Sequence, residues 1–137
     1  MGRILAIDFG LKRTGLAVTD PLQIIATSLQ TSPTPEVILF LKQYIPRENV
    51  EEIVIGMPKR MDNSDSEIVP SVRQFIEKLE KAFPGLAIKQ VDERFTSKIA
   101  QRAMIDGGMK KKDRRVKGNV DKISATLILQ SYLESRR

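Results

Sequence analysis

The spacing of the apolar residues changes part-way along this chain, and that change restricts the fold. Up to about residue 29, short apolar runs are separated by turns that contain Gly or Pro, which is typical of an antiparallel meander. The strands expected there are Arg3–Phe9, Leu16–Thr19 and Ile24–Leu29. From Thr34 onward, apolar residues at helical spacing alternate with further short apolar runs. This alternation predicts parallel strands joined by right-handed helical crossovers.

Two strands and four helices are expected in this second part. The strands are Ile53–Ile55 and Ala87–Val91. The expected helix starts are Thr34 followed by Pro35, Ser64 to Glu67, Thr96 or Ser97, and Asn119. Pro46 is expected to end the first of these helices, and Pro84 with Gly85 the second.

The order of these elements, β-β-β-α-β-α-β-α-α, predicts a single α/β domain over residues 1–137. Its sheet would be mixed and five-stranded, with a three-strand antiparallel meander, further parallel strands and flanking helices. The ribonuclease H-like fold has this order of elements. No apolar run reaches 18 residues and no secretory leader is evident, so neither membrane insertion nor export is expected. The absence of cysteine fits a cytoplasmic protein.

The chain contains no His and no Cys, which limits its chemistry. It excludes a histidine general base, a cysteine nucleophile, a Ser-His-Asp triad and a zinc site built from these residues. A hydrolase made from this alphabet would use carboxylates with a hard cation such as Mg²⁺ or Mn²⁺. The acidic candidates follow apolar runs or open a helix: Asp8, Asp92, Glu93 and Asp121.

Each of these carboxylates also has a plainer interpretation. Asp8 could cap a turn, and Asp121 could simply favour the positive end of its helix. Asp92 and Glu93 are neighbours on a strand, where side chains alternate, so they cannot easily face one metal ion. One of the two is expected to be a ligand and the other structural, without a preference at this point.

Basic residues concentrate in one segment. The formal net charge is +6, and residues 110–117 hold six Lys or Arg against one Asp. Such a run predicts binding to phosphates, although a solvated loop is the alternative. The expected nucleic-acid contacts are Arg13, Lys59, Arg94, Lys110, Lys111, Lys112, Arg114, Arg115 and Lys117.

Four motifs together resemble the YqgF-type (RuvX) family. They are Asp8-Phe9-Gly10 with Arg13 and Gly15, Gly56-Met57-Pro58, Asp92-Glu93-Arg94 with Thr96, and Asp121 to Ala125 with Leu129 and Tyr132. They span nearly the whole chain in the order found in the family. Members are assigned either Holliday junction resolution or pre-16S rRNA processing. The resemblance implies a ribonuclease H-like fold, a carboxylate site for divalent metal, and cleavage of nucleic-acid phosphodiesters.

The expected function is therefore that of a metal-dependent endonuclease, with Asp8, Glu93 or Asp92, and Asp121 as metal ligands. The expected partner is structured RNA or branched DNA, acted on by a monomer or a homodimer. Processing of the pre-16S rRNA 5′ end is the first expectation, and junction resolution is the second. Two other classes stay open: a non-catalytic RNA-binding assembly factor, and a phosphate-binding lobe of an actin-like ATPase.

Overall fold

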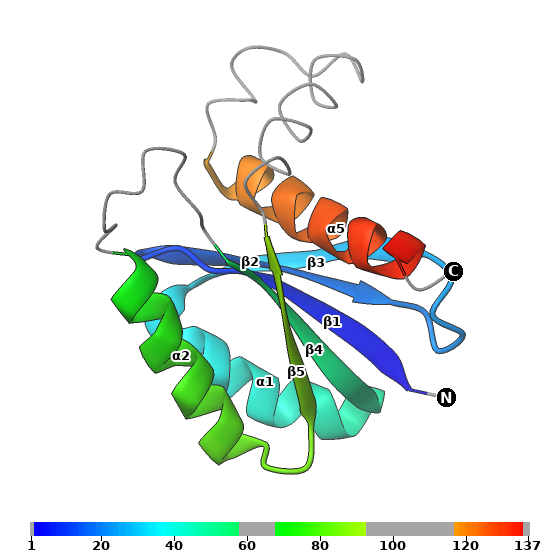
Figure 1. Cartoon of the computed structure of the whole chain (residues 1–137), viewed down its shortest axis with the longest axis horizontal. Coiled ribbons are helices and arrows are strands. Elements are labelled where there is room, and N and C mark those ends of the chain that lie inside the picture. Colours follow the sequence, from blue (N-terminus) through cyan, green and yellow to red (C-terminus); the bar gives the residue numbers. More distant parts are fainter. Residues whose placement is uncertain (1, 58–67, 93–116, 136–137) are drawn as a thin grey trace.

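The computed structural model describes residues 2–57, 68–92 and 117–135. Five strands form one sheet in the order β3-β2-β1-β4-β5 (Figure 1). They are β1 (Arg3–Asp8), β2 (Arg13–Thr19), β3 (Ala26–Pro33), β4 (Val50–Met57) and β5 (Ala87–Asp92). The first three pair antiparallel, whereas β4 lies parallel to both β1 and β5. The expected mixed sheet is confirmed.

Helices cover both faces of this sheet. The helices α1 (Thr34–Glu48) and α2 (Ile68–Ala82) lie on one face, and α5 (Lys117–Ser135) lies on the other (Figure 1). The helix expected after Thr96 or Ser97 falls outside the described residues, as does the expected start of α2 between Ser64 and Glu67.

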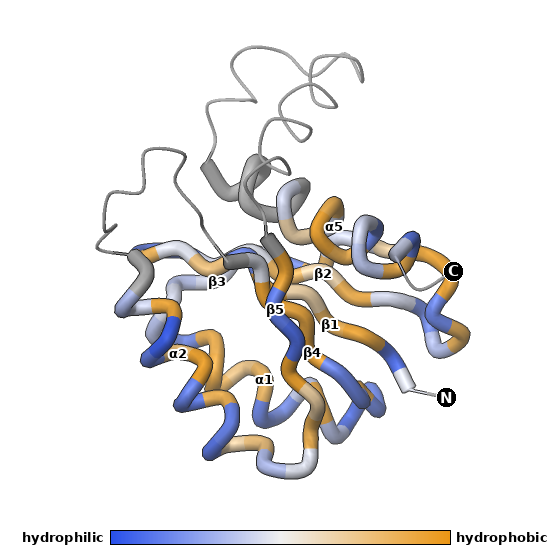
Figure 2. The backbone as a smooth tube through the Cα atoms, in the orientation of Figure 1, coloured by the Kyte–Doolittle hydropathy of each residue, from blue (hydrophilic) through white to orange (hydrophobic). Residues whose placement is uncertain are grey.

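Two apolar cores form because side chains alternate along the strands. On β1, Leu5 and Ile7 pack with α1 and α2, whereas Ile4 and Ala6 pack with α5. All four are fully buried, which explains the unbroken apolar run of β1 (Figure 2). The helices show mixed hydropathy in Figure 2, as expected for helices that bury only one side. The small residues Ser124 and Ala125 of α5 are buried against the sheet.

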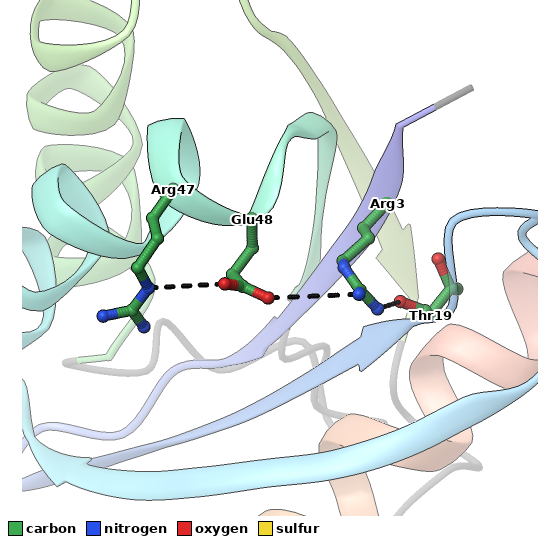
Figure 3. A network of polar contacts seen from close by, with 4 residues as sticks. All are labelled: Arg3, Thr19, Arg47 and Glu48. Carbon is green, nitrogen blue, oxygen red and sulfur yellow. Dashed lines mark hydrogen bonds and ion pairs between the residues drawn. The ribbon is translucent and has the colours of Figure 1, made fainter.

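A polar network holds the N-terminal end of β1 in place (Figure 3). Arg3 donates to the carbonyl of Thr19 at 3.1 Å and lies 3.9 Å from Glu48 at the end of α1. Arg47 approaches the same carboxylate at 3.3 Å. The Thr19 hydroxyl in turn accepts a 2.9 Å bond from the amide of Ile4. These contacts join β1, β2 and α1 where β1 begins.

Three expected helix ends were wrong. Thr34 does not cap α1, because Pro33 precedes the helix and no side-chain cap bond is present there. Pro46 lies inside α1, which continues to Glu48 because the buried residues Tyr44 and Ile45 hold its last turn. The helix closes at Asn49, whose left-handed backbone directs its N–H to the Ile45 carbonyl. Asn119 does not cap α5 either, since that helix begins at Lys117.

The third strand also differs from its expected range, because β3 begins at Ala26 instead of Ile24. The carboxylate of Asp20 accepts the backbone N–H groups of Leu22, Ile24 and Ile25 at 2.8–3.1 Å. These bonds hold residues 20–25 as a turn, with Leu22, Ile24 and Ile25 exposed. The apolar pair that suggested a strand is therefore part of this turn.

We expect this turn to contribute stability that depends on pH. The hydrogen bonds from Ile25 and Ile24 lower the pKa of Asp20 below its ordinary value of 3.8. The contribution is then present in full above pH 3.8 and is lost as the pH falls through the lower, folded-state value. Asp20→Ala should therefore lower the melting temperature at pH 7, and its difference from wild type should shrink on acidification. Glu77→Ala, an exposed acid on α2, is the control. A difference that grows at low pH would contradict this assignment.

Candidate metal and nucleic-acid site at the carboxyl end of the sheet

Asp8 is the last residue of β1 and lies between two glycines. Its partner in β2 is Gly15, and its partner in β4 is Gly56. The positions directly opposite this partly exposed residue in both neighbouring strands therefore carry no side chain. Glycine within a strand often marks a place where a ligand or another backbone comes close. This position leaves room for a hydrated cation or a phosphate.

The face of the sheet on which Asp8 stands follows from strand alternation. Ile4 and Ala6 contact α5, and Asp8 continues that series. Val91 of β5 also packs with the α5 core, and its partner in β4 is Gly56. The strands β1 and β5 are thus separated by β4, about 10 Å across two strand spacings.

The N-terminal part of α5 lies toward the same end of the sheet. Thr126 bonds to Ser28 at 2.8 Å, and Ser28 is level with Ala17 and, through it, with Ala6. Further along α5, Tyr132 donates to Glu52 near the start of β4 at 2.7 Å. The helix therefore runs antiparallel to β1, and its earlier residues approach the carboxyl end of that strand (Figure 1). Position 121 is five residues before Thr126, about 7.5 Å along the axis.

Of the expected metal ligands, only the side chain of Asp8 lies within the described residues. Side chains of Asp92 and Asp121 lie outside the described set, and Glu93 lies outside the described residues altogether. The described residues contain no group of three or more acidic side chains that could hold a metal ion. The convergence of Asp8, Glu93 or Asp92, and Asp121 stays a prediction.

Most of the expected basic contacts are outside the described residues as well. These are Lys59, Arg94, Lys110, Lys111, Lys112, Arg114 and Arg115. The backbone of Lys117 forms the first position of α5. Arg13, the first residue of β2, is exposed beside the turn that follows Asp8. That placement suits contact with a phosphate at the sheet edge.

Two threonines that the sequence did not indicate as site residues hold the turn after Asp8. Thr14 is fully buried, and its hydroxyl lies 2.9 Å from that of Thr34. Thr34 donates its proton to the Gly10 carbonyl at 2.5 Å, so the Thr14 hydroxyl donates to Thr34. The amide of Gly10 donates to the Thr14 hydroxyl at 3.5 Å, and the amide of Thr34 donates to the Lys12 carbonyl at 3.0 Å. A local cap was expected of Thr34, and only the folded chain reveals its distant partner.

Comparison with known proteins identifies the family. The model of the family described as "RuvX: Holliday junction resolvase" matches residues 2–135. The chain belongs to the RuvX family. A relative from Phocaeicola vulgatus, named "Putative pre-16S rRNA nuclease", is 55% identical over 100% of this chain and 99% of its own length. One of the same name from Bacteroides thetaiotaomicron is 54% identical with the same coverage.

Solved structures support the fold of this RuvX family member. RuvC of Thermus thermophilus, in complex with a Holliday junction substrate, has a TM-score of 0.60 at 16% identity, over 99% of this chain and 96% of that one. The yeast mitochondrial Holliday junction resolvase Ydc2 has a TM-score of 0.57 at 12% identity, covering 96% and 78%. The expected ribonuclease H-like fold is confirmed. Within the described parts of this family member, no helix is long and apolar enough to cross a membrane.

Proposed function

We propose that this RuvX family member is a divalent-metal-dependent endonuclease that processes pre-16S rRNA in the cytoplasm. The observation that carries the proposal is Asp8, a carboxylate at a strand end with glycine on both sides. The close relatives named for pre-16S rRNA support the choice of substrate. We take residues 1–137 to act as one domain.

A hard cation fits the donors that this end of the sheet offers. Carboxylate oxygens are the ligands that Mg²⁺ and Mn²⁺ prefer, and the glycines beside Asp8 leave space for bound water. We infer that Asp8, Glu93 and Asp121 hold the ion or ions. When bound, such ions activate a water molecule and stabilise the leaving oxygen of an in-line displacement.

Strand alternation favours Glu93 over Asp92 as the second ligand. Val91 packs on the α5 face, and a strand returns to the same face every second residue. Continuing β5 by two positions from Val91 leads to residue 93. The face on which Asp8 stands would then receive Glu93, and Asp92 would have a structural role.

Junction resolution is the second candidate. It is favoured by the description of the family model and by the fold shared with RuvC. A junction has two strands to cut, so this activity would favour a homodimer, whereas trimming one RNA end requires only a monomer. Cleavage of a precursor 16S rRNA and a four-way DNA junction, side by side with Mg²⁺ and with Mn²⁺, separates the two. Binding without cleavage of either substrate would support a non-catalytic assembly factor instead.

The 110–117 run is expected to supply much of the nucleic-acid affinity. Replacing Lys110, Lys111 and Lys112 by Gln should flatten the slope of log K against log[salt], by up to about 0.9 per lost duplex phosphate contact. The control is the double variant Lys42→Gln with Lys81→Gln, at exposed positions on α1 and α2. The change in slope is divided by the number of charges removed before the two variants are compared. The measurement is a binding titration at several salt concentrations. An equal change in both variants would mean that the run acts only through net charge.

A further inference from the structure

A cavity of about 260 Å³ opens next to the turn that follows Asp8. Its lining includes Phe9, Leu11, Ile38, Gln74, Phe75 and Lys78. We propose that it holds one unpaired nucleotide of the strand that is cut at Asp8. The inference rests on the proposed nuclease function and names the kind of substrate that this function would take.

The cavity begins one residue after Asp8 along the chain, at Phe9, but it lies on the other face of the sheet. Phe9 is the residue after Asp8, and it packs with α1 and α2, on the face opposite to α5. A strand that leaves Asp8 must pass over the turn at residues 10–13 to reach the cavity. Lys12 and Arg13 are exposed on that turn and suit its phosphates.

Only an unpaired strand can follow this path. Phe9 at the cavity packs on the α1 and α2 face, whereas Asp8 continues the Ile4 and Ala6 series on the α5 face, so a strand that reaches both must turn sharply around the end of a single sheet. Duplex DNA has a persistence length of about 50 nm, so it does not bend sharply around the end of one sheet. Single-stranded RNA bends readily and exposes its bases for contact with protein.

The chemistry of the lining matches one nucleotide. Phe9 and Phe75 form a tilted aromatic pair with centroids 5.1 Å apart, and Leu11 and Ile38 extend this apolar floor. Gln74 can both donate to and accept from the edge of a base, and Lys78 can pair with a phosphate. None of the residues that line the cavity, all from the described part of the chain, is acidic.

The size of the cavity favours a single base. Pockets for drug-sized ligands usually enclose about 300–1,000 Å³, so this one is smaller than that range. Leu11 is 54% exposed at its edge, where a base could cover it. The consequence is substrate selection: an RNA with unpaired nucleotides beside the cut should bind better than one that is paired throughout.

The test uses two RNA hairpins with the same paired sequence, one carrying a single-stranded flank and the other blunt. Binding is measured by fluorescence anisotropy without metal, and cleavage is measured separately with Mn²⁺. Leu11→Ala with Lys78→Ala removes one apolar contact and one cation from the cavity, and both side chains reach its surface, so folding should be retained. Lys81→Ala, exposed on the same helix outside the cavity lining, is the matched control.

We expect the double variant to bind the flanked hairpin roughly 10-fold more weakly, on the scale of losing part of one buried apolar side chain and one phosphate contact. Binding of the blunt hairpin should not change, and the control should match wild type. An equal loss of affinity for both hairpins would mean that Lys78 contacts duplex phosphate. Unchanged affinity for both would mean that the cavity holds no nucleotide of this RNA. Either result overturns the proposal. Selective binding without any wild-type cleavage would instead retain the nucleotide site and reject the nuclease function.

Discussion

Asp8→Asn should abolish cleavage while the protein still folds and binds nucleic acid. Asparagine keeps the shape of the side chain but loses the negative charge that a hard cation requires. Removing a residue that only hydrogen-bonds a metal ligand typically lowers metal affinity or activity by about 10–100-fold. Loss of a direct ligand should therefore reduce kcat by more than roughly 100-fold. Affinity for the polyanion without metal should be equal or higher, because one repulsive carboxylate is gone.

Three measurements on one preparation decide this prediction: thermal melting, metal-free binding, and cleavage with Mn²⁺. Glu77→Gln, an exposed acid on α2, is the matched loss of one charge. If the folded Asp8→Asn protein still cleaves, Asp8 does not belong to the mechanism. Lost binding with normal melting would make Asp8 a substrate contact instead of a metal ligand.

Gly10→Ala should have the second large effect, because the turn after Asp8 has no room for a side chain. A Cβ atom at Gly10 would lie 2.2 Å from the carbonyl oxygen of Arg13. That atom is backbone, so the turn itself must move. Overpacking of this kind costs about 1–3 kcal/mol. The movement would also displace the end of β1, so we expect cleavage to fall further than stability alone explains.

Gly85→Ala is the control for this substitution. Its Cβ would meet nothing within 4 Å. Alanine at such a site changes stability little, or raises it by about 0.4–1 kcal/mol through the unfolded state. Chemical denaturation and cleavage assays on both variants make the comparison. Equal stability of the two variants would show that the turn adjusts without cost.

The sheet could be predicted from the sequence because its central strands are buried on both faces. Ile4 to Ile7 and Ile53 to Ile55 are unbroken apolar runs, and each is fully buried. The same holds for α2, where Val72, Phe75, Ile76 and Leu79 repeat at helical spacing and are all buried. In these elements, local pattern and tertiary packing favour the same structure.

Two of the errors occurred where a side-chain hydrogen bond overrode the preference of the local sequence. The Thr34 hydroxyl could have capped its own helix, but it bonds to Gly10, 24 residues earlier. Ile24 and Ile25 suit a strand, yet the carboxylate of Asp20 holds them in a turn. At the candidate site, motif order indicated the acidic residues, whereas the two glycines beside Asp8 emerge only from the register of three strands.

The contact between α5 and the sheet has a consequence for the order in which the parts of the protein can fold during synthesis. Within the described residues, the second core requires Ala125, Ile128, Leu129 and Leu133 to cover Ile4, Ala6, Ala17 and Val54. Synthesis proceeds from the N-terminus, at roughly 5–20 residues per second. During translation this face of the sheet would stay uncovered until α5 leaves the ribosome. Since α5 also carries Asp121, a partly synthesised chain would have the sheet but could not yet complete the proposed metal site.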